Sequence, residues 1–103
     1  MILTTGEALP DKQINEVLGL VKGSSIRTRH IGRDLQAVLR DIVGGEVRPY
    51  VEMMNSTRDD ATRRMTDEAE ALEADAVIAI RHTTSTVMHG AAEVFVYGTG
   101  VKT

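Results

Sequence analysis

The sequence contains no cysteine and no tryptophan, and its 103 residues include only one phenylalanine and two tyrosines. Without cysteine the chain can form no disulfide, no thiolate metal site and no thiol nucleophile. With so few aromatic side chains it also lacks the stacking platform on which single-stranded nucleic acids bind. These absences exclude several classes of function before any motif is considered.

The chain also lacks an excess of positive charge, because twelve Lys and Arg stand against fifteen Asp and Glu, for a formal net charge of −3. A mildly acidic domain is poorly suited to binding nucleic-acid phosphates. No apolar run approaches the roughly 18 residues of a membrane span, and residues 1–10 lack the basic cluster of a signal peptide. We therefore expect a cytoplasmic protein that binds neither nucleic acid nor membrane.

What is present fits one domain over residues 1–103, since 42% of the residues are hydrophobic and chains of this length form single domains. Patterns of apolar and β-branched residues predict four strands: Ile2–Thr5, Ile14–Val21 with a polar continuation over Ser25–His30, Ala76–Thr84 and Ala92–Val101. Within these strands Gly19 predicts a bulge, Gly23-Ser24 predicts a turn or bulge, and Gly98 and Gly100 predict a bulge or a close backbone approach.

The apolar period changes to that of a helix in the middle of the chain. A short helix is predicted around Leu35–Ile42 and ends at Gly44-Gly45. A longer helix is predicted from about Val51 to Glu73, with an apolar stripe formed by Met54, Ala61, Met65, Ala69 and Leu72. The predicted order is β-β-α-α-β-β: an α+β fold with a four-stranded, mainly antiparallel sheet covered on one face by one short and one long helix.

The predicted strands are apolar on more than one face, and these two helices would leave part of that surface exposed in a monomer. Association with further copies of the chain removes this exposure, and cyclic symmetry is the usual arrangement. We therefore expect a cyclic homo-oligomer.

A basic run from Arg27 to Asp34 is one candidate for a ligand site. Strand alternation puts Arg27 and Arg29 on one face, and Arg33 lies at the predicted helix start, where backbone N–H groups favour an anion. Together these groups would hold a phosphate or a carboxylate. The alternative is that the arginines form ion pairs with Asp34, Glu46 or the acidic helix.

Three histidines offer a second kind of site, although none has the spacing of a metal motif. His82 or His89 would bind a divalent metal ion with Glu93 if the predicted hairpin brings them together. The alternative is that these histidines face solvent. His82 beside the hydroxyl run at residues 83–86 is the only hint of catalysis, and turn chemistry also explains such hydroxyls. The sequence therefore favours binding over enzymatic activity.

Several short segments, spread over nearly the whole chain, form a further pattern. They are Thr4-Thr5, Glu16-Val17-Leu18-Gly19, Arg29-His30-Ile31-Gly32-Arg33-Asp34, Ile42-Val43-Gly44-Gly45-Glu46, Tyr50 with Arg58, Ala61, Met65, Glu68 and Ala69, Ala74-Asp75-Ala76-Val77, and Glu93-Val94-Phe95-Val96-Tyr97-Gly98-Thr99. Through these segments the chain resembles the YbjQ-like family of small bacterial and archaeal proteins.

The resemblance implies a dodecin-like subunit assembled as a ring, a homopentamer. The family is described as heavy-metal-binding, so a divalent metal ion is a candidate cofactor, although the sequence does not identify one. Within the matching pattern we predict that Arg29 and Arg33 hold an anionic ligand. We expect Asp34 and Glu46 to orient these arginines, with Tyr50 nearby.

The prediction is therefore an oligomeric protein that binds a small anionic ligand or a metal ion at subunit interfaces. The alternative is a scaffold whose ring assembly is itself the function.

Overall fold

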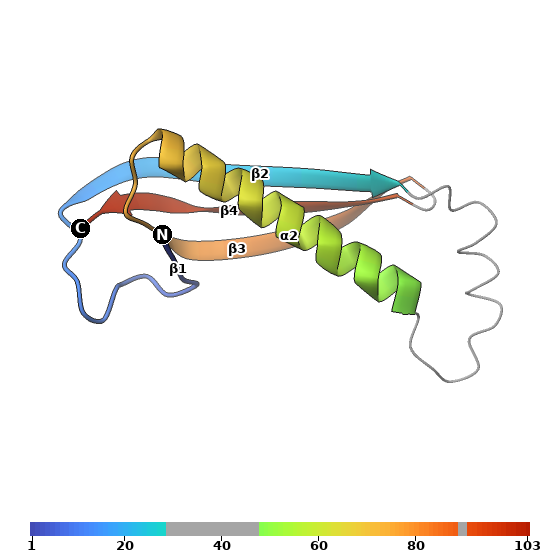
Figure 1. The fold of residues 1–103 in the computed structure, drawn as a ribbon, viewed down its shortest axis with the longest axis horizontal. Coiled ribbons are helices and arrows are strands. Elements are labelled where there is room, and N and C mark those ends of the chain that lie inside the picture. The colour runs from blue at the N-terminus through green and yellow to red at the C-terminus, as the bar shows by residue number, and fades with distance from the viewer. Residues whose placement is uncertain (29–47, 89–90) are drawn as a thin grey trace.

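The computed structural model describes residues 1–28, 48–88 and 91–103. Its elements are β1 (Ile2–Leu3), β2 (Glu16–Thr28), α2 (Arg48–Ala71), β3 (Ala76–Met88) and β4 (Ala91–Lys102). The strands form a four-stranded mixed sheet in the order β1-β3-β4-β2, in which only β1 and β3 are parallel. Helix α2 lies across one face of this sheet (Figure 1). The predicted α+β class and four-stranded sheet are confirmed.

Two details of the prediction change. The described residues contain one helix, not two, and the short helix predicted around Leu35–Ile42 lies outside them. Strand β2 runs without a turn at Gly23-Ser24, because the pairing of these residues with Val96 and Phe95 keeps its register. The bulge predicted at Gly19 is confirmed by a register shift between Val17 and Gly19 and by a φ of 122°. No helix of the described residues has the length and hydrophobicity to cross a membrane.

Helix α2 packs mainly on β2 and β4, through side chains at every fourth position that are at most 6% exposed: Met53, Thr57, Ala61, Met65 and Ala69. Leu72, predicted in this stripe, is 43% exposed because it follows the end of the helix at Ala71, and Met54 is only partly buried. Thr57 takes a core position because its Oγ1 donates a hydrogen bond to the Met53 carbonyl at 2.7 Å.

The main core lies between α2 and the sheet, where Met65 packs with fully buried valines of three strands: Val21, Val77, Val94 and Val96. A second, smaller cluster of Leu9, Ala76, Ile78 and Val101 lies on the opposite face. The N-terminal segment covers this end of the sheet, since the Gly6 carbonyl accepts a hydrogen bond from the Ala79 N–H at 2.8 Å. Within residues 1–28, 48–88 and 91–103, the sheet is therefore covered on both faces only near the chain termini.

Farther along the strands, no described residue covers the face opposite α2. We call this surface the outer face; it comprises Leu20, Lys22, Ser24 and Ile26 of β2, Glu93, Phe95 and Tyr97 of β4, and Arg81, Thr83 and Ser85 of β3. Leu20 and Ile26 are 63% and 54% exposed, and the rings of Phe95 and Tyr97 lie 5.6 Å apart. Apolar side chains on this face therefore remain in contact with solvent.

Candidate functional site

Strand β2 is the last strand on one side of the sheet, and among the described residues it pairs only with β4. Every second one of its 13 residues therefore points its backbone N–H and C=O groups away from β4, toward a side where the described residues place no further strand. Such an edge is a ready template for another peptide backbone. The middle of this edge, around Ser24, is where α2 comes close.

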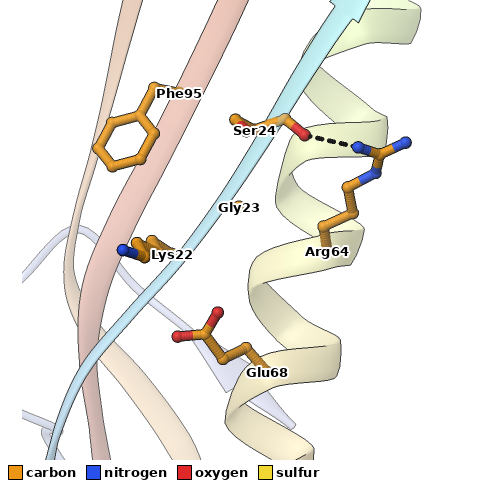
Figure 2. Close-up of a pocket in the computed structure, with 6 residues that line it drawn as sticks. All are labelled: Lys22, Gly23, Ser24, Arg64, Glu68 and Phe95. Atoms are coloured by element: carbon orange, nitrogen blue, oxygen red, sulfur yellow. Dashed lines mark hydrogen bonds between the residues drawn. The ribbon is translucent and has the colours of Figure 1, made fainter.

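Gly23 permits this close approach. A Cβ atom at position 23 would lie 2.5 Å from the backbone nitrogen of Met65 and closer still to the Ala61 carbonyl oxygen. A real side chain cannot occupy that space, because both neighbours are helix backbone. The glycine therefore brings two charged side chains of α2, Arg64 and Glu68, to the edge of β2 (Figure 2).

Arg64 links the helix to the strand edge. Its Nη1 donates to the Ser24 carbonyl at 3.0 Å, and its Nη2 lies 3.3 Å from the Asp60 carboxylate. Asp60 also accepts hydrogen bonds from Arg63 and, at 2.7 Å, from the Ser25 hydroxyl. The Arg63 bond, followed by the Ser25 bond, lowers the pKa of Asp60 from 3.8 to about 2. The ionised Asp60 carboxylate thus holds Arg64 in place at the edge.

A groove of about 390 Å³ lies at this point and is lined by Lys22, Gly23, Ser24, Arg64, Glu68 and Phe95. We call it the edge groove. In Figure 2, Arg64 and Glu68 reach toward β2 from the helix, whereas Lys22 and Phe95 lie on the other side of the strand. The groove therefore passes around the edge of β2 and joins the helix side to the outer face.

The edge groove contains charged and polar groups with unused binding capacity. Neither Lys22 nor Glu68 forms an ion pair with another described residue. Arg64 uses two nitrogens toward Ser24 and Asp60, and a guanidinium carries five N–H donors. In an antiparallel ladder the N–H and C=O of one residue point to the same side, so the Ser24 N–H faces the groove with its carbonyl. These groups can bind a small polar ligand.

Four of the ligand residues predicted from the sequence, Arg29, Arg33, Asp34 and Glu46, lie outside the described residues. Tyr50 belongs to the first turn of α2, and its side chain also lies outside the described part.

Within the described residues of one chain, the predicted metal ligands do not lie together. His82 faces α2, where its Nε2 lies 3.3 Å from the Thr62 hydroxyl. Glu93 lies on the outer face, with its carboxylate 3.5 Å from the Ser85 hydroxyl. The sheet therefore separates His82 from Glu93, because the two side chains point to opposite faces. The third candidate, His89, lies outside the described residues.

Comparison with known proteins agrees with the pattern found in the sequence. The family model YbjQ, described as "Putative heavy-metal-binding", matches residues 1–103. This chain belongs to the YbjQ family. The family resemblance predicted from the sequence is therefore confirmed.

Relatives of this YbjQ-family chain cover nearly its whole length. A UPF0145 protein of Colwellia psychrerythraea is 49% identical over 102 residues, which are 99% of this chain and 97% of the relative. A UPF0145 protein of Thermotoga maritima is 47% identical over 102 residues, with 99% and 96% covered. A crystal structure of a protein of the DUF74 family from Pediococcus pentosaceus matches with a TM-score of 0.71 at 18% identity, covering 99% and 96% of the two chains. This last likeness supports the fold.

The described residues of this YbjQ-family chain do not fit a heavy-metal centre. They contain no group of three or more His, Asp and Glu side chains placed to hold a metal ion. The whole sequence lacks cysteine, whose thiolate is the ligand that soft metal ions prefer. The described geometry offers donors and cations for a ligand other than a metal.

The sequence patterns did not indicate Lys22, Arg64 or Glu68 as site residues. Arg64 and Glu68 are two of many charged residues on the long helix, and Lys22 falls between the predicted strand segment Ile14–Val21 and its continuation over Ser25–His30. Gly23 was the available signal, because a glycine inside a strand often marks a close backbone approach. Only the tertiary structure shows that α2 makes this approach.

Proposed function

We propose that this YbjQ-family chain is an oligomeric binding protein that holds a small anionic ligand in the edge groove, at an interface between subunits. The observation that carries the proposal is the edge of β2 beside Arg64 and Lys22, which pairs with no further strand in the part of the chain that the structure describes. A guanidinium, an ammonium and an unpaired backbone N–H form a set of donors suited to a carboxylate or a phosphate. Binding, without chemistry on the ligand, is what this set of groups supports.

The oligomeric part of the proposal rests on the outer face. Exposed Leu20 and Ile26 lie on a long edge strand, and soluble proteins normally cover such strands with another element or another subunit. When one surface of each subunit binds a different surface of the next subunit, the subunits form a closed ring if the rotation between neighbours allows closure. A ring of five subunits, as the family resemblance implies, would bury this face.

The ligand residues predicted from the sequence remain part of this proposal. Strand β2 ends at Thr28, so the basic run from Arg27 to Asp34 begins in the last two residues of the strand that carries the groove. Arg29 and Arg33 would add positive charge at that end. Asp34 and Glu46 would orient them, with Tyr50 nearby.

The test is native mass spectrometry of untagged protein, purified without a metal-affinity resin. We expect a ring with a reproducible excess mass that is lost in Arg64→Met. The matched control is Arg58→Met, because Arg58 is an exposed arginine of the same helix that hydrogen-bonds Asn55 and does not line the groove. A monomer without excess mass contradicts the proposal. An excess mass that a chelator removes would instead identify a metal ion.

A second candidate function, a scaffold whose ring assembly is sufficient, is favoured by the exposed apolar residues of the outer face alone. A ring that carries no excess mass and binds no anion would support it. In either case Leu20→Ser combined with Ile26→Ser should yield monomers. Val51→Ser, at an exposed apolar position on α2, is the matched control and should leave the ring intact.

A further inference from the structure

We infer that the edge groove selects ligands that carry both a carboxylate and an ammonium group, and that a dipeptide has the size to fit. This inference rests on the proposed function, because it concerns the same groove. It adds the chemical class of the ligand. It is supported by Glu68, by the spacing of charges along α2 and by the backbone of Ser24.

Glu68 is the feature that an anion alone leaves unexplained. Its carboxylate lines the groove together with Arg64 and Lys22, and it would repel a purely anionic ligand. Arg64 forms no ion pair with Glu68, because two of its nitrogens point to Asp60 and to the Ser24 carbonyl, while its remaining N–H donors can still bind a ligand carboxylate. An ammonium group on the ligand would pair with Glu68 and remove the repulsion.

The spacing of the two helix charges matches the length of a dipeptide. Arg64 and Glu68 are four residues apart, which corresponds to a rise of about 6 Å along a helix. Two extended residues span about 7 Å. A dipeptide could therefore place its carboxylate at Arg64 and its ammonium group at Glu68. The groove volume of about 390 Å³ lies within the usual range of small-ligand sites.

The strand edge and the outer face supply the remaining contacts. The Ser24 N–H, which faces the groove, can donate to the peptide carbonyl of the ligand, as in the addition of a strand to a sheet edge. An apolar side chain of the ligand would reach Phe95 and the aliphatic part of Lys22. The charged ends, the peptide group and the apolar side chain of the dipeptide would therefore each contact a partner in the edge groove.

Isothermal titration calorimetry with three matched ligands at about pH 7 tests the inference. They are glycyl-phenylalanine, its N-acetyl form, which lacks the ammonium group, and its C-terminal amide, which lacks the carboxylate. We expect glycyl-phenylalanine to bind about five-fold more tightly than either blocked form, the effect of one solvent-accessible ion pair. Equal binding of the N-acetyl form would overturn the inference and leave an anion site. Absence of binding by all three would overturn the inference, and inorganic phosphate, titrated in parallel, would then show whether the groove binds anions at all.

Substitution of Glu68 provides the second arm. In Glu68→Gln, glycyl-phenylalanine should bind no more tightly than its N-acetyl form, while the affinity for the N-acetyl form stays constant or rises. Glu70→Gln, an exposed position of the same helix outside the groove, should keep the full preference. A preference that survives Glu68→Gln would show that Glu68 does not bind the ammonium group.

Discussion

The two faces of β2 lie in opposite surroundings although their residues are similar. Toward α2, Val21, Gly23 and Ser25 are buried, whereas Leu20 and Ile26 on the outer face are 63% and 54% exposed. A leucine in water beside a valine in the core shows that residue type does not decide burial on this strand. The helix covers one face, and the described chain offers no second layer for the other. We therefore expect subunit stability to depend on the helix face and association on the outer face.

The largest expected effect comes from the helix face. Met65→Ala removes a fully buried side chain between α2 and the sheet, and should lower the free energy of unfolding by about 3 kcal/mol. Ile26→Ala on the outer face should change the free energy of unfolding of the dissociated subunit by about 0.5 kcal/mol or less. Urea unfolding, at protein concentrations too low for the subunits to associate, measures both free energies of unfolding. Equal losses would show that the two faces are covered alike.

Gly23 lies on the helix face, where β2 comes closest to α2, and should give the next largest effect. Gly23→Ala places a methyl group against the backbone of Ala61 and Met65, and should cost about 2 kcal/mol as α2 moves away. Ser24→Ala, the next residue and one that faces outward, is the control and should cost much less. Thermal unfolding compares the two variants. A well-folded Gly23→Ala protein of unchanged stability would mean that the helix does not press on this strand.

Acid should weaken the contact between α2 and the helix face of β2. The pKa of Asp60 is about 2 in the folded chain, against an ordinary 3.8, so between these values the unfolded chain binds more protons. The contribution of Asp60 to stability is therefore complete above about pH 5 and is lost as the pH falls from 3.8 toward 2. Urea unfolding from about pH 5 to pH 2 should show a smaller slope in Asp60→Asn. Asp59→Asn, which removes a neighbouring carboxylate and leaves the Asp60 hydrogen bonds to Arg63 and Ser25 in place, is the matched control, and an unchanged slope in Asp60→Asn would disprove the assignment.

The smallest expected effect lies at the end of α2, away from both faces. Glu73 has a φ of 60°, in the left-handed region, and the helix closes there through a 3.0 Å hydrogen bond from the Ala74 N–H to the Ala69 carbonyl. Glycine is the usual residue at such a position. Glu73→Gly should raise the free energy of unfolding by about 0.5–1 kcal/mol, measured by urea unfolding. Asp67→Gly, inside the helix, should lower it, and a loss in both variants would contradict the capping role of residue 73.

Local patterns in the sequence predicted the parts of the fold that depend on neighbouring residues. The strand segments, the long helix and the bulge at Gly19 follow from side-chain periodicity and from the backbone freedom of glycine, and the family follows from short motifs. Local patterns did not predict which residues belong to the buried stripe of the long helix. Thr57 is buried and Leu72 exposed, because a threonine can bond its own helix and a leucine past the last turn no longer faces the sheet.

The edge groove was not predictable in the same way. Lys22 and Arg64 are 42 positions apart in the sequence, and nothing in the spacing of either residue points to the other. The sequence by itself determined the strands, the long helix, the absence of thiol chemistry and the family, because these depend on composition and on short-range pattern. Tertiary structure decided which face of β2 is covered and which charges meet at its edge. The reason is that a helix can pack against only one face of a strand, and only the packed chain shows which face that is.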